Sequence, residues 1–420
     1  MDRFDRQRRI AGWNQERLEQ STVLVCGRGW LGAFTVWGLA SMGIGRILWV
    51  GKPVEATDPL ANWFLAEPSP FAGTAIHDYP LDVEYGSELT WIEAGTRLDV
   101  VLACPEDRVA HGLCWRFAAE RRAAFHGATG TGGGWIGSTV PVLEGDEARS
   151  HPATALVAAA LLVDAVREAL APLHGGRLAA GRLALDPPAS CGDTSCLLVG
   201  VGGIGVYVAT LAAVLGMPAL LIDDDRVDAT NLNRQGLFRA ADVTRRAWKA
   251  VAAADVLRSL FPRSRLRAET RRADDRIGDV LVRERTSLVL SAVDNAASRL
   301  LLQDAGRRHG AHVVQGGTDV FVADVYTQGT EGPRLDEQMR GAMTRGRTQE
   351  GARRGSRGAG CAGDPSYVVP GMIAAGLMVH RALAAGRSRD PAPLHWRTGA
   401  VPVEGRTADD GFDFSGITVA

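Results

Sequence analysis

A glycine-rich turn in the second half of the chain could hold a phosphate group. Residues 200–205 read GVGGIG, and glycines at such a turn let the backbone approach a phosphate at the N-terminus of a helix. Asp223 ends the next apolar stretch, where its carboxylate could accept hydrogen bonds from the two hydroxyls of a ribose. This pattern indicates a nucleotide site, and it fits NAD or FAD as well as ATP. The glycines assigned to the site are Gly200, Gly202, Gly203 and Gly205.

The segment NLNRQ, residues 231–235, favours a triphosphate. Asn231 and Arg234 stand eight and eleven residues after Asp223, in a loop that leaves the carboxyl edge of the expected sheet. A guanidinium there could neutralise charge that moves onto a leaving pyrophosphate, whereas a hydride-transfer enzyme has no evident use for it. Lys249, one of only two lysines in the chain, could add a point charge for the α-phosphate. An exposed helix lysine is the alternative interpretation.

A further polar group follows a later apolar strand. The segment SLVLSAV, residues 287–293, leads directly into Asp294 and Asn295. Because carboxylates suit a magnesium ion that bridges phosphate oxygens, Asp294 is the candidate metal ligand. A helix N-cap is the alternative role for Asp294. We also assign Asn295 and Asp225 to the nucleotide site.

The elements that must position these groups occur twice in the chain. Residues 21–51 and 194–224 superimpose without a gap at an offset of 173, and four glycines coincide. Each copy predicts an apolar strand, a glycine turn, a helix ended by glycine and a second apolar strand, which together form a βαβ unit. A later strand also recurs, as DVVLAC before Pro105 and as SLVLSAV before Asp294. The fold class is therefore α/β, with two tandem Rossmann-like domains.

Helical and loop-like segments set the domain boundaries. Residues 152–171 have the proline start and apolar spacing of a helix that closes the first domain. A Gly/Arg-rich stretch predicts a mobile loop, and the apolar segment after it predicts a helix that covers the second sheet. The last residues show no clear element. We therefore predict a first domain at 1–174, a linker at 175–192, a second domain at 193–386 with a mobile loop at 329–363, and a tail at 387–420.

The first copy lacks the polar set of the second. At the same offset, Val50, Asp58 and Ala61 stand where the second copy has its aspartate, asparagine and arginine. Its glycine turn also carries Arg28 and Trp30, which are bulky where the second copy has valine and glycine. We therefore expect the first domain not to turn over ATP.

Composition excludes several classes of partner. The formal net charge is −1, so no field of either sign attracts nucleic acid or an anionic membrane. The N-terminus is charged where a signal peptide needs an apolar run, and no stretch reaches the length of a membrane span, which predicts a cytoplasmic protein. The six cysteines include no Cys-x-x-Cys pair, so no structural zinc is expected.

Taken in order, these motifs resemble the ThiF/MoeB/HesA family of adenylyltransferases and the ubiquitin-activating enzymes. The shared pattern is G-x-G-G-x-G, an aspartate, N-L-x-R-Q, a lysine and D-N-x-x-x-R. The resemblance implies two ThiF-type domains that form a pseudodimer within one chain. It implies that Asp223 binds ribose, that Asp294 binds Mg²⁺, and that the triphosphate is held by Asn231, Arg234 and Lys249. Gln235 belongs to the motif, and we assign it to the nucleotide site.

One departure concerns the lysine. In the family it usually lies four residues after the valine that corresponds to Val243, whereas Lys249 lies six residues after it. The resemblance therefore requires a local bulge before Lys249. Arg245 or Arg246 is the alternative cation.

Two further residues are implied by the resemblance. The opening RFDRQRR resembles the family's R-Y-x-R-Q-x-R, in which the second arginine crosses to the phosphates of the other subunit; here that residue is Arg6, with a solvated basic N-terminus as the alternative. Cys361 stands in the loop before the last helix, where some members carry a nucleophile that forms a thioester or persulfide. A structural thiol is the alternative. Cys26, Cys104 and Cys196 lie on apolar strands and are expected in the core.

The function expected from these motifs is ATP-dependent adenylation of a carboxylate. The substrate would be the C-terminus of a ubiquitin-like or sulfur-carrier protein or of a ribosomal peptide, and the acyl group would then pass to a thiol, sulfur or amine, in a biosynthetic pathway. The protein would act as a monomeric pseudodimer or as a homodimer of it. The alternatives are an NAD- or FAD-dependent oxidoreductase and a non-catalytic peptide-binding module.

Overall fold

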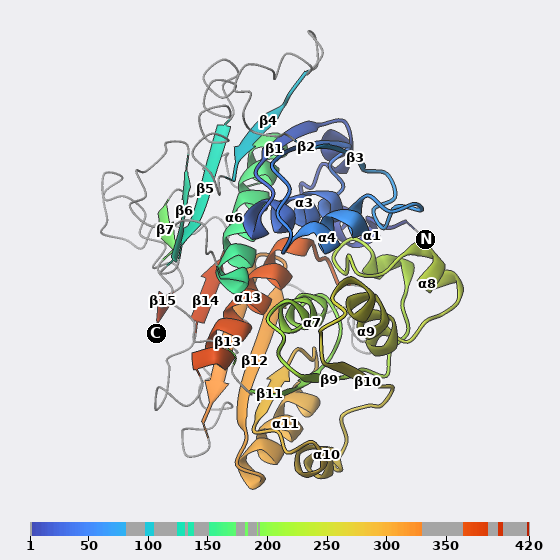
Figure 1. Ribbon diagram of the computed structural model, residues 1–420, viewed down its shortest axis with the longest axis vertical. Coiled ribbons are helices and arrows are strands. Elements are labelled where there is room, and N and C mark those ends of the chain that lie inside the picture. The colour runs from blue at the N-terminus through green and yellow to red at the C-terminus, as the bar shows by residue number, and fades with distance from the viewer. Residues whose placement is uncertain are drawn as a thin grey trace.

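The computed structural model describes two β-sheets, one in each half of the chain (Figure 1). The described residues are 2–80, 97–104, 124–130, 133–137, 151–173, 181–183, 191, 194–329, 364–384, 394–397 and 418–419, and four of these segments, 124–130, 133–137, 181–183 and 418–419, are described by their backbone only.

The first sheet has the strand order β3-β2-β1-β4-β5-β6-β7. Neighbours from β3 to β5 run parallel, and β6 and β7 are added antiparallel. The strands are β1 (Thr22–Cys26), β2 (Arg46–Gly51), β3 (Ala75–Pro80), β4 (Val100–Ala103), β5 (Ala124–Gly130), β6 (Gly133–Gly137) and β7 (Gly181–Leu183).

The second sheet repeats this order as β10-β9-β8-β11-β12-β13-β14 and adds β15 at its edge. It is parallel from β10 to β12 and antiparallel beyond. The strands are β8 (Cys196–Val199), β9 (Ala219–Ile222), β10 (Leu266–Glu269), β11 (Leu288–Ser291), β12 (His312–Asp319), β13 (Val322–Gln328), β14 (Leu394–Arg397) and β15 (Thr418–Val419).

The predicted βαβ repeat is present in both halves. Helix α3 (Trp30–Met42) joins β1 to β2, and α7 (Gly205–Val214) joins β8 to β9. After these helices the chain turns through glycine, at Gly43 with φ +89° and at Gly216 with φ +67°, a backbone conformation that other residues rarely adopt. The α/β class with parallel sheets therefore agrees with the prediction.

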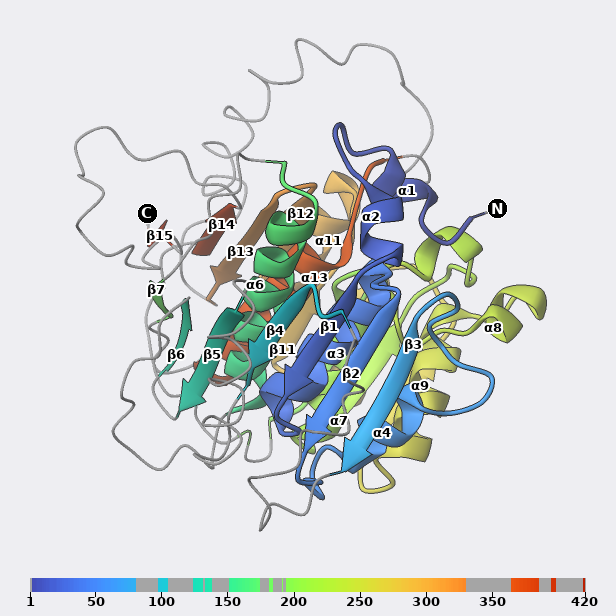
Figure 2. The same cartoon turned by 90° about the horizontal axis from the view of Figure 1, so that it is seen from above.

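Two long helices pack against each other between the sheets (Figures 1 and 2). They are α6 (Pro152–Leu170) and α13 (Val368–Ala384), and each is almost completely buried because most of its residues are apolar; the buried Arg167 of α6 is paired with Asp164 and Glu168. Helix α3 packs on α6, and α7 packs on α13. Apolar side chains of all four helices belong to one continuous core, so the two halves fold around shared contacts.

The ends of α6 and α13 correspond to each other residue by residue. Tyr367 precedes α13, and its hydroxyl donates to the Asp164 carboxylate of α6 at 3.0 Å. At the other end, His151 precedes α6 and lies near His380 of α13: burial, together with the charge of His380, lowers the pKa of His151 to about 4. Asp164 and His380 are each the thirteenth residue of their helix. The thirteenth residue of each helix thus lies near the residue that precedes the other helix, and the polar groups differ between the two ends.

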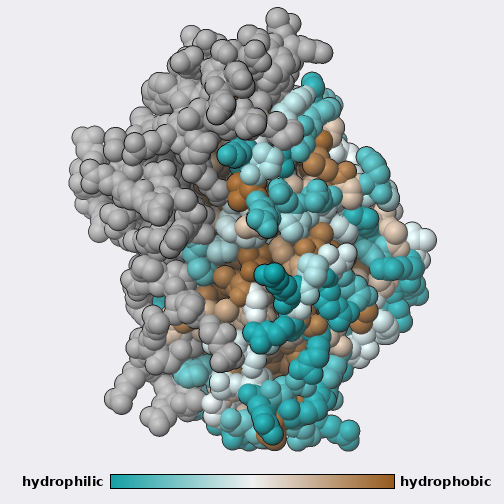
Figure 3. Space-filling model, viewed as in Figure 1, coloured by the Kyte–Doolittle hydropathy of each residue, from teal (hydrophilic) through white to brown (hydrophobic). Residues whose placement is uncertain are grey.

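The shorter helices lie around this frame. Helices α10 and α11 enclose a second apolar cluster against β8, β9, β11 and β12. Figure 3 shows mainly hydrophilic residues on the side of the molecule that carries α8 and α9. Apolar residues appear at the surface nearer the middle of the view. The bounds are α1 (Asp5–Arg8), α2 (Gln15–Glu19), α4 (Asp58–Phe64), the 3₁₀ turn η3 (Ala229–Asn231), α8 (Ala240–Thr244), α9 (Lys249–Leu260), α10 (Ile277–Glu284) and α11 (Ala296–Arg308).

Three segments differ from the sequence-based expectation. Strand β7 lies within the segment predicted as a linker, and β14 and β15 lie within the tail in which no element was expected. These strands are two to four residues long, and edge strands of this length carry little periodicity of their own. Most of the predicted mobile loop lies outside the described residues. None of the helices in the described part of the chain is long and apolar enough to cross a membrane.

Candidate nucleotide site

The glycine turn lies between β8 and α7. Gly200 has φ +91°, and a Cβ there would come within 2.7 Å of the Ala292 carbonyl oxygen. A Cβ on Gly205 would come within 2.0 Å of the Gly200 carbonyl oxygen, so both positions exclude a side chain. Helix α13 also approaches the turn closely, because a Cβ on Gly371 would lie 2.3 Å from the Gly203 carbonyl oxygen. The turn is thus tightly closed on itself and is approached by the backbone at Ala292 and by α13.

Asp223 accepts hydrogen bonds from the backbone of the turn and of its own loop. Its Oδ2 accepts from the Val201 N–H at 2.6 Å, and its Oδ1 accepts from the Asp225 N–H at 2.8 Å. Burial raises the pKa of Asp223, and the charge of Lys249 and the two backbone hydrogen bonds oppose this effect only in part. The carboxylate is therefore fixed beside the glycine turn, at the carboxyl end of β9.

Lys249 begins α9 and reaches the same group of carboxylates. Its Nζ lies 2.7 Å from Asp225 Oδ2, with 10% of the lysine side chain and 68% of the aspartate side chain exposed. The expected bulge before it is visible as a break between α8 and α9, where Arg246 adopts φ +51°. Residues 243–261 are therefore not one continuous helix. Arg245, the alternative cation, pairs with Asp242 at 2.6 Å.

Arg234 lies across the glycine turn. Its Nη1 donates to the Thr230 carbonyl oxygen at 2.7 Å and to Asn233 Oδ1 at 2.8 Å. A Cβ on Gly203 would come within 3.3 Å of the arginine's Cδ and Nε. The missing side chain at Gly203 therefore makes room for the arginine next to the start of α7, where an anion would bind.

Gln235 and Asn231 are both buried in the same loop. Gln235 is 2% exposed, its Oε1 has no hydrogen-bond partner, and its Nε2 would lie 3.9 Å from a Cβ on Gly202. Asn231 Oδ1 accepts from the Asp228 N–H at 3.0 Å and so closes the turn η3. Asn231 therefore shapes the loop that carries Arg234.

Arg6 extends from the first half towards this loop. It lies in α1 and is 7% exposed, so it is not a solvated N-terminal residue. Burial alone would raise the pKa of Asp228, but hydrogen bonds from Thr230 and the charges of Arg6 and Lys249 lower it. The Arg6 carbonyl oxygen also accepts from the Ser366 N–H at 3.3 Å. A cation of the first half thus contributes to the electrostatics of the second.

Asp294 and Asn295 follow β11 at the same edge of the sheet. Asn295 is the N-cap of α11, since its Oδ1 accepts from the Ser298 N–H at 2.8 Å. The capping role considered for Asp294 is therefore wrong, and Asp294 is exposed in the loop just before the cap. Carboxylate oxygens of Asp223, Asp224 and Asp225 lie within 4.8 Å of one another, close enough to share a cation, and Asp294 is not part of that group.

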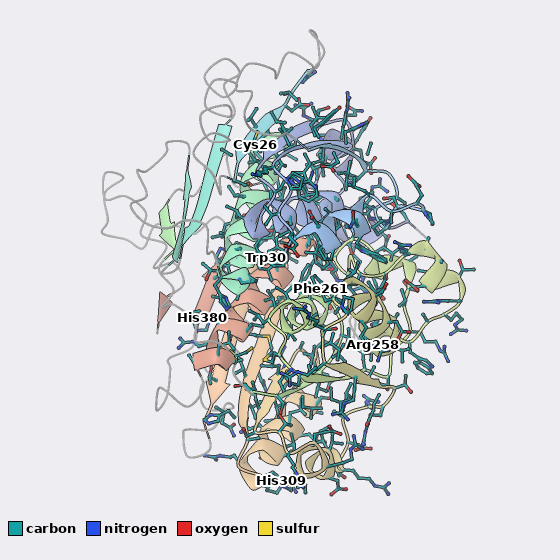
Figure 4. The ribbon with its side chains drawn as sticks, in the orientation of Figure 1. Cys26, Trp30, Arg258, Phe261, His309 and His380 are labelled. Atoms are coloured by element: carbon teal, nitrogen blue, oxygen red, sulfur yellow. The ribbon has the colours of Figure 1, made fainter. Side chains whose placement is uncertain are left out.

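The cysteines of the described strands lie in the core, as expected. Cys26, labelled in Figure 4, Cys104 and Cys196 are buried, and burial raises the pKa of the Cys196 thiol to about 12. A thiol with this pKa is not a nucleophile at neutral pH. Cys361, the candidate nucleophile, lies outside the described residues.

The turn of the first half is filled by its own side chain. Arg28 is 5% exposed, forms an ion pair with Asp78 of β3, and stacks on Trp49 with 4.7 Å between the guanidinium carbon and the ring centroid. Val50 stands in place of the aspartate and is buried. Two contributors escaped the sequence reasoning: the pairing of Arg28 with Asp78, and Asn233, which occupies the variable position of N-L-x-R-Q. Their contacts span 50 and 226 positions of sequence, and no local pattern reports them.

Comparison with known proteins finds similarity for the second half of the chain. Residues 188–385 match the ThiF family. The Escherichia coli sulfur carrier protein ThiS adenylyltransferase is 34% identical over 119 residues, which cover 28% of this chain and 46% of that protein. The SAMP-activating enzyme E1 of Haloferax volcanii is 32% identical over 139 residues, or 33% and 50% of the two chains. The second half is thus similar to the ThiF family and to proteins named adenylyltransferases.

These matches cover only part of each relative's length. The probable adenylyltransferase/sulfurtransferase MoeZ of Mycobacterium tuberculosis is 32% identical over 136 residues, which cover 32% of this chain and 34% of that protein. The matched segment therefore spans half or less of the length of each of these relatives. A crystal structure of selenomethionine PaaA aligns with a TM-score of 0.40 and 19% identity, over 49% of this chain and 69% of that one. That likeness is too weak to support an argument.

Proposed function

We propose that the chain is an ATP-dependent adenylyltransferase whose site lies at the carboxyl edge of the second sheet. The observation that carries the proposal is the position of Arg234, whose side chain crosses the turn at Gly203. An NAD or FAD site requires the turn and Asp223 but gives this guanidinium no task. A triphosphate that loses pyrophosphate needs a planar cation beside the turn. The names of the ThiF-family relatives support the same assignment.

In this reaction each polar residue of the second half has its own role, and Arg6 of the first half assists them. Asp223 accepts hydrogen bonds from the ribose, and the backbone N–H groups at the start of α7 bind phosphate oxygens. Lys249 exchanges Asp225 for an α-phosphate oxygen, and Arg234 and Arg6 stabilise the charge of the departing pyrophosphate. A substrate carboxylate attacks the α-phosphorus, so that an acyl-adenylate forms and pyrophosphate leaves. Asp294 would hold Mg²⁺, which lowers the charge of the phosphates when bound.

The first half is a degenerate domain that forms a pseudodimer with the second. It repeats the strand order, supplies Arg6, and has its turn closed by Arg28. The domains predicted at 1–174 and 193–386 extend further in this proposal, since β7 joins the first sheet and β14 and β15 join the second. The acyl substrate is the C-terminus of a small ubiquitin-fold sulfur carrier or of a ribosomal peptide, as the relatives that act on sulfur carriers suggest. The acyl group then passes to a thiol, sulfur or amine acceptor.

ATP–pyrophosphate exchange tests the proposal. Radiolabelled pyrophosphate should enter ATP only when a suitable carboxylate is supplied from a panel of sulfur-carrier proteins and free peptide C-termini. Asp294→Ala should lower exchange about a hundredfold or more, and Arg6→Ala should lower it less, since other cations remain. Tight binding of NAD or FAD without ATP binding would instead support the oxidoreductase. Unchanged exchange in Asp294→Ala would reject the metal role.

A further inference from the structure

Asn233 is a buried amide that hydrogen-bonds three separate parts of the molecule. It is 0% exposed. Its Oδ1 accepts from Arg234 Nη1 at 2.8 Å. Its Nδ2 donates to Gln7 Oε1 at 3.3 Å and to the Ser366 carbonyl oxygen at 3.0 Å. One side chain thus touches the arginine of the nucleotide site, the N-terminal segment of the first half, and the residues that lead into α13.

Gln7 continues this chain of hydrogen bonds into the core of the first half. It is also 0% exposed, and its Nε2 donates to the Met42 carbonyl oxygen at 2.8 Å and to Gln15 Oε1 at 2.5 Å. Met42 is the last residue of α3, which packs on α6 at the centre of the molecule. The series of hydrogen bonds that starts at Asn233 therefore ends on a buried helix and not on a surface loop.

We propose that Asn233 is a positioning residue, which links Arg234 to the first half through Gln7 and so orders the guanidinium before ATP binds. The proposal rests on the proposed function. An arginine side chain has many rotamers, and a site that fixes one of them in advance loses less entropy when the ligand binds. The Thr230 and Asn233 contacts of Arg234 are both made within its own loop, but Asn233 also hydrogen-bonds Gln7 and so connects the arginine to the first half.

Three variants separate the two links of this relay, by which we mean the hydrogen bonds from Arg234 to Asn233 and from Asn233 to Gln7. Asn233→Ala removes both the acceptor for Arg234 and the donor to Gln7. Asn233→Asp keeps an acceptor for Arg234 and removes the donor. Gln7→Ala removes the far link and leaves Asn233 and Arg234 in place. A purely structural role of Asn233 would not distinguish these variants at Arg234, because all of them disturb the same buried interface.

The test measures ATP affinity by titration calorimetry and the order of the Arg234 side chain by ¹⁵N relaxation of its Nε. Asn233→Ala should weaken ATP binding about tenfold and make the Nε mobile, and Gln7→Ala should weaken it about threefold. Asn233→Asp should leave the Nε intermediate in order between the wild type and Asn233→Ala, since a carboxylate still accepts from Arg234 but no longer donates to Gln7. Gln7→Ala added to Asn233→Ala should change the affinity by less than about 1.5-fold, because the relay is already broken.

Gln328→Ala is the matched control. Gln328 is another fully buried amide of the second half, and its Nε2 donates to the Gln303 carbonyl oxygen of α11 at 3.3 Å, away from the nucleotide loop. It should lower stability while ATP affinity stays within about twofold of the wild type. A wild-type chain that binds no ATP would reject the proposed function, and the relay would then be judged from the order of Arg234 alone. An Arg234 Nε that stays as ordered in Asn233→Ala as in the wild type would overturn the relay.

Discussion

The two glycine turns share a backbone and differ in what surrounds it. In the second half the turn meets a fixed carboxylate, Asp223, and an arginine that lies across it from a neighbouring loop. In the first half the turn itself carries Arg28, which is buried against Trp49 and neutralised by Asp78. An arginine is thus present at both turns. At the second it can meet a ligand's charge, and at the first its charge is already satisfied.

Under the proposed function, the first half keeps the fold of the second without its nucleotide site. The βαβ unit depends on apolar strands and on glycines that allow close approach, and both survive in the first half. Ligand binding depends on a few polar side chains, and these are absent there. What retains the first half is its packing: α3, α6 and the N-terminal segment form part of the core and of the nucleotide loop's support.

The largest expected effect comes from the contact between the halves. Trp37 of α3 is fully buried, and its ring centroid lies 5.0 Å from that of Tyr207 of α7. Trp37→Ala should therefore cost about 3–5 kcal/mol of unfolding free energy. Chemical denaturation should show one transition for both halves before and after the change. Two separate transitions would contradict the shared core. Trp30→Ala, at the partly buried first residue of the same helix (labelled in Figure 4), should cost less.

Removal of Arg234, the arginine that lies across the second turn, should give the next largest effect. Arg234→Ala should lower ATP–pyrophosphate exchange about 10²- to 10³-fold, or about 2.7–4 kcal/mol, because it deletes a cation that stabilises the transition state. Arg245→Ala is the control, since that arginine is 64% exposed and pairs with Asp242. Exchange should be nearly unchanged in the control. Equal losses in both variants would show that the arginine across the turn has no special role.

The corresponding change in the first half should affect stability and not nucleotide binding. Arg28→Ala leaves Asp78 without its ion-pair partner and removes the stack on Trp49, so about 1–3 kcal/mol of stability should be lost. Calorimetry should still count one ATP per chain, because Val50 and Ala61 offer nothing to ribose or phosphate. Two ATP molecules per chain would mean that Arg28 alone had closed the first turn.

The smallest effect should be a change in the pH dependence of stability when His151 is replaced, at the end of the α6–α13 pair where it lies near His380. The pKa of His151 is lowered to about 4, below the 6.5 of an unfolded histidine. Between these values the unfolded chain binds a proton that the folded chain does not, so the histidine lowers stability as the pH falls from about 6.5 towards 4. His151→Gln should therefore lose less stability between pH 7 and pH 5 than the wild type, as urea titrations can measure.

The opposite end of the same helix pair provides the comparison. Burial and the neighbouring Asp164 charge raise the pKa of Tyr367 well above its usual value, so this phenol stays neutral over the same pH range. Tyr367→Phe should lower stability by a similar amount at pH 7 and at pH 5. If Tyr367→Phe changed the pH dependence of the unfolding free energy as much as His151→Gln does, the acid sensitivity could not be assigned to His151.

Much of the fold was decided locally and could be predicted from the sequence. Apolar strands, the glycines at 27, 200 and 205, and the helices that end at Gly43 and Gly216 follow from backbone sterics and short-range periodicity. The repeat at an offset of 173 made the two halves visible, and the missing polar residues predict that the first half binds no nucleotide. The candidate site residues Asp223, Asn231, Arg234 and Gln235 also stand in one short stretch, which a sequence pattern can report.

Only the tertiary structure decided which partners these residues have. Asn233 meets Gln7, Arg28 meets Asp78, and Arg6 lies near Asp228, each across tens to hundreds of residues. The strands β7, β14 and β15 form because a sheet edge is available to pair with them, and not because their own residues demand it. Periodicity encodes what a segment does by itself, whereas hydrogen bonds and ion pairs between distant segments depend on where the whole chain has folded.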